Sequence, residues 1–215
     1  MISLPNGVGL KNLIQFLNMI GSKSSSILLK YENDSIPLFD SIDKLDFNKN
    51  INEPVTSADL AVNKFILDIF LKYYPNVNWD ILTEENEKVE NSRNSKGEWF
   101  WLVDPLDGTR DFIKKTGEYA IHIALLNKNQ PILGTVILPS RNEIWFGVNG
   151  LGTWKESLNS NLVEKNFVNC KNKKALNLLI SRSHSNQKLK NVIEQLSFEK
   201  VIHMGSIGYK ICSLL

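Results

Sequence analysis

The sequence predicts an α+β chain that changes to an α/β arrangement near its end, on three observations. Apolar residues recur at helical spacing in two segments of the first 75 residues. Short apolar segments separated by turn residues follow, as in antiparallel strands joined by hairpins. After residue 175, strand patterns alternate with helical ones, which favours parallel strands. We therefore expect an N-terminal α+β domain over residues 1–170 and the start of a C-terminal α/β domain over residues 171–215.

Composition and charge exclude several classes of protein. The 25 lysines and arginines nearly balance the 23 aspartates and glutamates, so no overall field attracts a nucleic acid polymer or an anionic membrane. No transmembrane segment is expected, and the first 20 residues lack the unbroken apolar run of a signal peptide. Cys170 and Cys212 have no metal-binding spacing, so we expect free thiols and a cytoplasmic location.

Two helices are predicted before residue 75. The first is amphipathic, with apolar positions at Leu10, Leu13, Ile14, Leu17 and Ile20. The second begins at a Thr56 or Ser57 cap and ends before Pro75. Asp59 lies in its first turn, where a carboxylate suits the helix dipole and needs no other role.

The segment after residue 98 contains the strongest functional pattern. The apolar residues 99–103 predict a buried strand that ends in two carboxylates, Asp104 and Asp107. Pro105 stiffens the turn between them, so both carboxylates and the Leu106 carbonyl can converge on one point. Oxygen donors of this kind suit a hard divalent ion such as Mg²⁺.

The residues that follow Asp107 predict a phosphate site. Gly108 allows close approach of the backbone, and the amides of Gly108, Thr109 and Arg110 open a short helix. An ordinary Asp-Gly turn is the alternative reading. The phosphatase motif Asp-x-Asp-Gly-Thr, with its nucleophilic aspartate, does not fit, because position 105 is proline.

A second acidic group precedes this segment. Glu84 and Glu85 follow the short apolar pair Ile81 and Leu82, so at least one carboxylate can point towards the Asp104 turn. A solvated acidic face is the alternative.

The segments after residue 118 predict the rest of the fold. Antiparallel strands are expected over residues 119–126, 132–138, 144–148 and 152–154, and His122 is interpreted as a packed or surface histidine. Residues 155–175 are interpreted as a connection. A strand over 175–180, a polar corner at 181–184, a helix over 186–196, a strand over 200–202 and a corner at 204–208 follow, and the second corner opens a helix with Lys210.

These motifs resemble the inositol monophosphatase superfamily, whose pattern is Val-Thr-x-x-Asp, Glu-Glu, Asp-Pro-(Ile/Leu)-Asp-Gly-Thr and a later Trp-Asp. The first three elements are Val55-Thr56-Ser57-Ala58-Asp59, Glu84-Glu85 and Asp104-Pro105-Leu106-Asp107-Gly108-Thr109. Within the superfamily, three segments resemble the 3'(2'),5'-bisphosphate nucleotidases: residues 111–118, Ser181-Arg182-Ser183-His184 and Gly205-Ser206-Ile207-Gly208-Tyr209-Lys210.

The resemblance implies a layered αβαβα sandwich of the inositol monophosphatase and fructose-1,6-bisphosphatase type. It implies two Mg²⁺ ions, the first held by Glu84, Asp104 and the Leu106 carbonyl, the second by Asp104 and Asp107. A water on the first ion is the implied nucleophile, deprotonated by Thr109, which Asp59 orients, with Glu84 beside it. Glu85 is an outer-shell residue by the same resemblance.

The resemblance also implies a substrate, adenosine 3',5'-bisphosphate or its phosphosulfate analogue, which would give AMP or adenosine 5'-phosphosulfate. The implied substrate contacts are Glu84, Leu106, Asp107, Gly108, Thr109, His184, Ser206 and Lys210. Ser181 and Ser206 can equally be helix caps. Lithium sensitivity, a place in sulfur metabolism and a possible homodimer are further expectations.

Two alternatives to this function stay open. The site can serve an inositol phosphate or fructose bisphosphate instead. No Trp-Asp follows Lys210, so the C-terminal part is expected to be incomplete, either because this is a fragment or because the product is truncated. The alternative of another class is an inactive remnant that binds metal or nucleotide.

Overall fold

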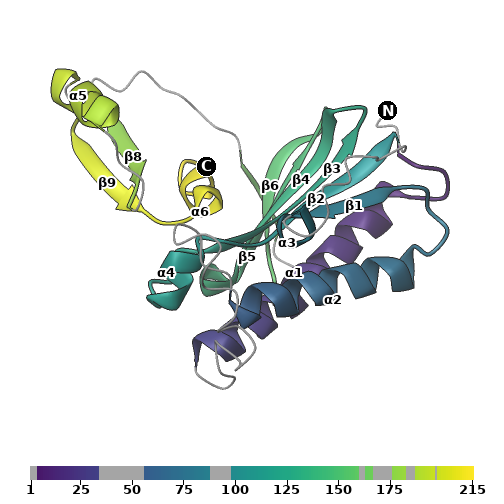
Figure 1. The fold of residues 1–215 in the computed structure, drawn as a ribbon. Coiled ribbons are helices and arrows are strands. Elements are labelled where there is room, and N and C mark those ends of the chain that lie inside the picture. Colours follow the sequence, from purple (N-terminus) through teal and green to yellow (C-terminus); the bar gives the residue numbers. More distant parts are fainter. Residues whose placement is uncertain are drawn as a thin grey trace.

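A seven-stranded mixed sheet forms the centre of the part of the chain that the structure describes (Figure 1). The computed structural model describes residues 4–33, 56–87, 98–159, 163–166, 176–182, 187–196 and 198–215. The seven strands of the main sheet lie in chain order; β1 is parallel to β2, and each later pair of neighbours in this sheet is antiparallel. They are β1 (Asp80–Thr83), β2 (Trp99–Asp107), β3 (Ala120–Asn127), β4 (Gln130–Leu138), β5 (Glu143–Val148), β6 (Gly152–Ser157) and β7 (Val163–Asn166).

The predicted hairpins after residue 118 are confirmed, but the connection predicted over residues 155–175 contains β7. This strand pairs with β6, which itself extends to Ser157. The sequence Val163-Glu164-Lys165-Asn166 has one apolar residue in four, so it carries no alternating pattern from which a strand can be read.

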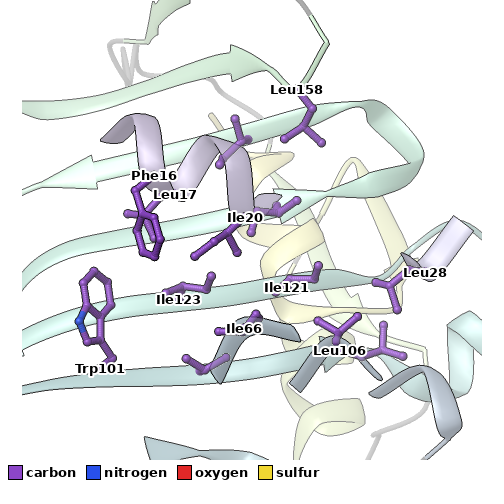
Figure 2. Close-up of a cluster of buried hydrophobic side chains, with 14 of the residues drawn as sticks. Phe16, Leu17, Ile20, Leu28, Ile66, Trp101, Leu106, Ile121, Ile123 and Leu158 are labelled. Carbon is purple, nitrogen blue, oxygen red and sulfur yellow. The ribbon is translucent and has the colours of Figure 1, made fainter. Parts of the chain in front are cut away.

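Helices α1 (Leu10–Glu32) and α2 (Ser57–Tyr73) lie along one face of the sheet (Figure 1). Figure 2 shows the resulting core, where Ile20 of α1 and Ile66 of α2 face Ile121 and Ile123 of β3. All four side chains are fully buried. Helix α1 continues well beyond the last predicted apolar position, and Leu28 still packs in the same core.

Strand β2 differs from its prediction in two respects. Trp101 and Val103 are buried, whereas Leu102 is 41% exposed, because α1 and α2 cover only one face at this point. The strand also continues past Asp104 to Asp107. Asp104 pairs with His122 and Asp107 with Ala120, so β2 carries one extra residue here and bulges. Proline, which has no backbone N–H, is tolerated in such a bulge.

The C-terminal segments alternate as predicted. Strands β8 (Asn177–Ser181) and β9 (Lys200–Met204) form a parallel pair, with α5 (Gln187–Gln195) between them in the chain. Helix α6 (Ile207–Cys212) then returns to the main sheet and packs on β3 and β4. Cys212 lies in a small buried cluster with Ala120, Leu138 and Trp145.

The layers are therefore α1 and α2, the main sheet, α6, and the β8–β9 pair with α5, in agreement with an αβαβα sandwich (Figure 1). Three short elements complete the description: α3 (Glu84–Glu87), α4 (Thr109–Ile113) and the 3₁₀ turn η2 (Pro139–Arg141). None of the helices in the described ranges combines the length and apolar character needed to cross a membrane.

Candidate active site

Parallel pairing of β1 with β2 brings two acidic segments together. Thr83 pairs with Val103, so Glu84, which follows β1, and Asp104 of β2 lie at the same end of these neighbouring strands. The pKa of Asp104 is raised to about 7: burial and the negative charges of Glu84 and Asp107 raise it, while His122 and the hydrogen bond from the Leu106 amide partly oppose this change. A cation placed among these carboxylates would relieve their mutual repulsion.

The bulge in β2 fixes the local arrangement. Asp104 Oδ1 accepts a hydrogen bond of 3.0 Å from the Leu106 amide across Pro105. The Leu106 carbonyl in turn accepts a hydrogen bond of 3.1 Å from Thr109 Oγ1. The predicted carboxylate, carbonyl and hydroxyl oxygens therefore belong to one short, connected segment.

Asp107 contacts the start of α6 through its Oδ2 atom. This oxygen accepts hydrogen bonds from Ser206 Oγ and, at 3.0 Å, from the Gly208 amide, and it lies 3.1 Å from His122 Nε2. Burial alone would raise the pKa of Asp107, but the hydrogen bonds from His122, Ser206 and Gly208 outweigh it and hold the pKa below its usual range. Asp107 is thus kept as a carboxylate.

Asp59 completes the capping box at the start of α2 and also contacts Thr109 of the candidate site. Its Oδ2 accepts a hydrogen bond of 2.8 Å from the Thr56 amide in a capping box, while its Oδ1 accepts one of 3.2 Å from Thr109 Oγ1. The side chain is buried, and burial raises its pKa to about 7; hydrogen bonds from Thr56 oppose this change and the charge of Glu85 adds to it. Asp59 therefore belongs to the start of α2, as predicted, and also contacts Thr109, while its role in catalysis stays a prediction.

Gly108 allows the 204–208 corner, the residues that join β9 to α6, to approach β2. Its φ of +92° lies in the left-handed region, where a side chain is strained. A Cβ at this position would also lie 3.1 Å from the Glu118 carbonyl oxygen and 3.2 Å from Ser206 Cβ. Glycine is required here for backbone conformation and for close packing.

The structure describes two of the three residues predicted to contact the nucleotide beyond its reacting phosphate, Ser206 and Lys210. Ser206 caps α6 by accepting a hydrogen bond of 3.1 Å from the Tyr209 amide, and the same hydroxyl contacts Asp107. Lys210 Nζ donates a hydrogen bond of 2.6 Å to the Gly205 carbonyl within the corner. His184 lies outside the described residues.

His122 is the site residue that the sequence analysis missed. Its Nε2 contacts Asp107, and a Cβ added to Gly208 would lie 2.4 Å from that nitrogen, so the imidazole sits between Asp107 and α6. The interpretation as a packed histidine agrees with this position, but the sequence did not show that the imidazole packs against a candidate metal ligand. The signal was the strand register, because His122 lies opposite Asp104 on the neighbouring strand.

The donor set fits a hard divalent cation in type and charge, since Glu84, Asp104 and Asp107 supply carboxylates and Leu106 a carbonyl. As the side chains stand, no three acidic, histidine or cysteine groups among the described residues surround one point. The three contacts of Asp107 Oδ2 with His122 and α6 explain part of this, because they turn that oxygen towards the corner.

Comparison with known proteins identifies the family. The model of the inositol monophosphatase family matches residues 10–215. The chain belongs to the inositol monophosphatase family.

Two solved structures share the family fold over most of this chain. An inositol monophosphatase of Thermotoga maritima aligns with a TM-score of 0.70 at 20% identity, over 91% of this chain and 69% of that one. CysQ of Bacteroides thetaiotaomicron aligns with a TM-score of 0.63 at 22% identity, over 89% and 72%.

Curated members of the family include similar sequences from enterobacteria. The 3'(2'),5'-bisphosphate nucleotidase CysQ of Escherichia coli K12 is 36% identical over 167 residues, which is 77% of this chain and 63% of the relative. The CysQ nucleotidase of Buchnera aphidicola is 36% identical over 161 residues, 75% of this chain and 58% of the relative. This chain therefore spans less than two thirds of the length of these family members.

The buried carboxylate of Asp59 gives a stability prediction with a definite sign. Its pKa of about 7 in the fold lies above the ordinary value of 3.8, so the fold loses stability as pH rises from the lower value through the higher one. Asparagine carries no such charge. In metal-free buffer, the Tm of Asp59→Asn relative to that of wild type should therefore rise by several degrees as the pH is raised from about 5 to about 8.

The control for this measurement is Asp68→Asn, which removes an exposed carboxylate from the same helix. Asp104, whose pKa is also raised to about 7, is present in all three proteins and cancels from the comparison. Equal changes in Tm with pH for the Asp59 and Asp68 variants would contradict the account of Asp59.

Proposed function

We propose that the protein hydrolyses the 3'-phosphate of adenosine 3',5'-bisphosphate, or of its 5'-phosphosulfate analogue, with Mg²⁺ as cofactor. The observation that carries this proposal is the placement of Glu84, Asp104 and Asp107 at one end of the β1–β2 pair, beside the Thr109–Asp59 pair. The similarity to CysQ nucleotidases at 34–36% identity supports the choice of substrate.

In this proposal Glu84, Asp104 and the Leu106 carbonyl hold one Mg²⁺, and Asp104 and Asp107 contribute to a second. Asp107 would use Oδ1, since the contacts with His122, Ser206 and Gly208 all use Oδ2. Bound Mg²⁺ supplies charge neutralisation at the phosphate and makes water more acidic. Glu85 stands in the outer shell, where its charge acts on Asp59.

The Thr109–Asp59 pair provides the chain's own proton chemistry. When the Thr109 hydroxyl donates to Asp59 Oδ1, its oxygen lone pairs can accept a hydrogen bond from an attacking water. A carboxyl group with a pKa of about 7 suits proton acceptance near neutral pH. Thr109 therefore orients the water, and Asp59 receives its proton through the threonine hydroxyl.

Substrate recognition falls to the residues around the 204–208 corner. The amides of Gly108 and Thr109 at the start of α4 would contact the transferred phosphate. Ser206 and Lys210 would contact the remainder of the nucleotide, together with His184 from outside the described residues. Lys210 can supply positive charge for the 5'-phosphate, which an inositol monophosphate lacks.

Phosphate release decides between this function and its alternatives. The longest natural form of the protein is assayed with adenosine 3',5'-bisphosphate, inositol 1-phosphate and fructose 1,6-bisphosphate, each with Mg²⁺ and with EDTA. We expect kcat/KM for the nucleotide to exceed the others by at least about tenfold and to vanish in EDTA. Preference for a sugar phosphate would favour the broader family activity, and no release from any compound would favour an inactive metal- or nucleotide-binding remnant.

The proposal has further parts that need their own measurements. We expect Li⁺ to inhibit phosphate release. We also place the reaction in sulfur metabolism in the cytoplasm, because the phosphosulfate substrate carries activated sulfate and the bisphosphate is what remains once that sulfate has been transferred. A homodimer is part of the same proposal. Inhibition curves, cell fractionation and the mass in solution test these three statements separately.

A further inference from the structure

An ion-pair network joins three separate segments beside the 204–208 corner. Arg182 follows β8, and its Nη1 donates to Asp111 Oδ1 of α4. Its Nη2 donates a hydrogen bond of 2.7 Å to Glu118 Oε2 in the loop before β3. The Asp111 side chain is only 6% exposed and that of Glu118 21%, so water screens these charges less than at an open surface.

The same network holds the corner directly. Glu118 Oε2, which accepts from Arg182, also accepts a hydrogen bond of 2.7 Å from the Gly205 amide. The Glu118 carbonyl accepts one of 3.1 Å from the Ser206 amide, and the Arg182 amide donates one of 2.9 Å to the Met204 carbonyl. Three consecutive residues of the corner are therefore fixed by Glu118 and Arg182.

Packing at Gly205 leaves no space between the corner and the network. A Cβ at this position would lie 2.5 Å from the Asp111 carboxyl group and 2.7 Å from the Glu118 carbonyl oxygen. No side chain fits without a shift of one of these groups. The corner thus rests on the two carboxylate residues that Arg182 binds.

The residues held in this way are those that contact Asp107. Ser206 Oγ donates to Asp107 Oδ2, and the Gly208 amide donates to the same oxygen at 3.0 Å. A chain of contacts therefore runs from Arg182 through Glu118 and the corner to the carboxylate of Asp107.

We propose that Arg182 is a positioning residue. Through Asp111 and Glu118 it holds Ser206 and the first turn of α6 against Asp107, in the position from which Ser206 contacts the substrate. The part that concerns the substrate rests on the proposed function. Arginine suits this role because its planar guanidinium can donate to two carboxylates at once, whereas a lysine ammonium has one nitrogen. Arg182 itself need not touch the substrate.

Amide hydrogen exchange tests the positioning without any need for activity. In Arg182→Gln, the amides of Gly205, Ser206 and Gly208 should exchange at least about tenfold faster than in wild type. The matched control is Arg141→Gln. It removes the guanidinium of η2 that contacts Tyr209 and Ser213, away from the corner, and should leave these three amides unchanged.

Unpairing the buried Asp111 can destabilise the fold, so a second variant, Arg182→Gln with Asp111→Asn, keeps the test valid. It should show the same faster exchange at the corner. Unchanged exchange at Gly205, Ser206 and Gly208 in either folded variant would overturn the proposal, whatever the activity.

Kinetics then separate positioning from a general structural role. Arg182→Gln should raise KM for adenosine 3',5'-bisphosphate by about tenfold and lower kcat by less than about threefold, and Arg182→Lys should recover little of the loss. Faster exchange with an unchanged KM would show that the network only stabilises the fold. A wild-type protein without phosphatase activity would contradict the proposed function, while the exchange result would still decide the positioning.

Discussion

Replacing Asp107 with asparagine is expected to lower kcat for phosphate release by at least about 10³-fold while the fold is kept. Asparagine has nearly the same shape, and its carbonyl oxygen can still accept the hydrogen bonds from Ser206 and the Gly208 amide. It lacks the negative charge that a divalent cation requires. The measurement is steady-state phosphate release with Mg²⁺, accompanied by a melting curve to verify the fold.

Glu98→Gln is a suitable control for this variant. It removes a carboxylate just before the other end of β2, where Glu98 is exposed and pairs with Lys128 at 2.9 Å. Its turnover should match that of wild type, because Glu98 lies away from the candidate site and exposed ion pairs contribute little to the stability of the fold. Retained turnover in Asp107→Asn would mean that the assignment of Asp107 to the metal site is wrong.

Replacing Thr109 with valine should lower kcat by at least about 10²-fold, with a smaller change in KM. Valine has the shape of threonine but cannot donate to Asp59 Oδ1 or to the Leu106 carbonyl. The attacking water then loses its acceptor and its path for the proton. Kinetics over a range of nucleotide concentrations separate kcat from KM.

The matched variant is Thr109→Ser, which keeps the hydroxyl and should recover most of the activity. Valine should also cost about 1 kcal/mol of stability, because Asp59 loses one hydrogen-bond donor in a buried position. Wild-type kcat in Thr109→Val would leave Asp59 and Thr109 as parts of a helix cap and a turn only.

Local patterns predicted the segments of the candidate site well. The order Asp104, Pro105, Leu106 and Asp107 after an apolar run is sufficient to expect several oxygen donors in one short segment, and this segment is the bulge of β2. The position of Glu84 also followed from its place after a short strand. What the sequence did not show is that β1 pairs in parallel with β2, because partners in a parallel pair are joined by long connections.

Contacts between distant segments were the harder part. His122 belongs to the site only because antiparallel register places it beside the Asp104 turn, and a single histidine in an apolar strand carries no sign of this. Ser206 was read either as a helix cap or as a substrate contact; its hydroxyl caps α6 and also reaches Asp107, 99 positions away. Arg182 belongs to a segment that resembles the nucleotidases, and its contacts with Asp111 and Glu118 could not be read from that segment.

We propose that Glu84, Asp104 and Asp107 together hold divalent cations at the end of β2. Anomalous diffraction from crystals soaked in Mn²⁺, a substitute for Mg²⁺ with a measurable signal, tests it most directly. We expect a peak within coordination distance of the Asp104 and Glu84 carboxylates and the Leu106 carbonyl, and no such peak in Asp104→Asn crystals. A peak bound only elsewhere, or the same peak in the Asp104→Asn crystals, would contradict it.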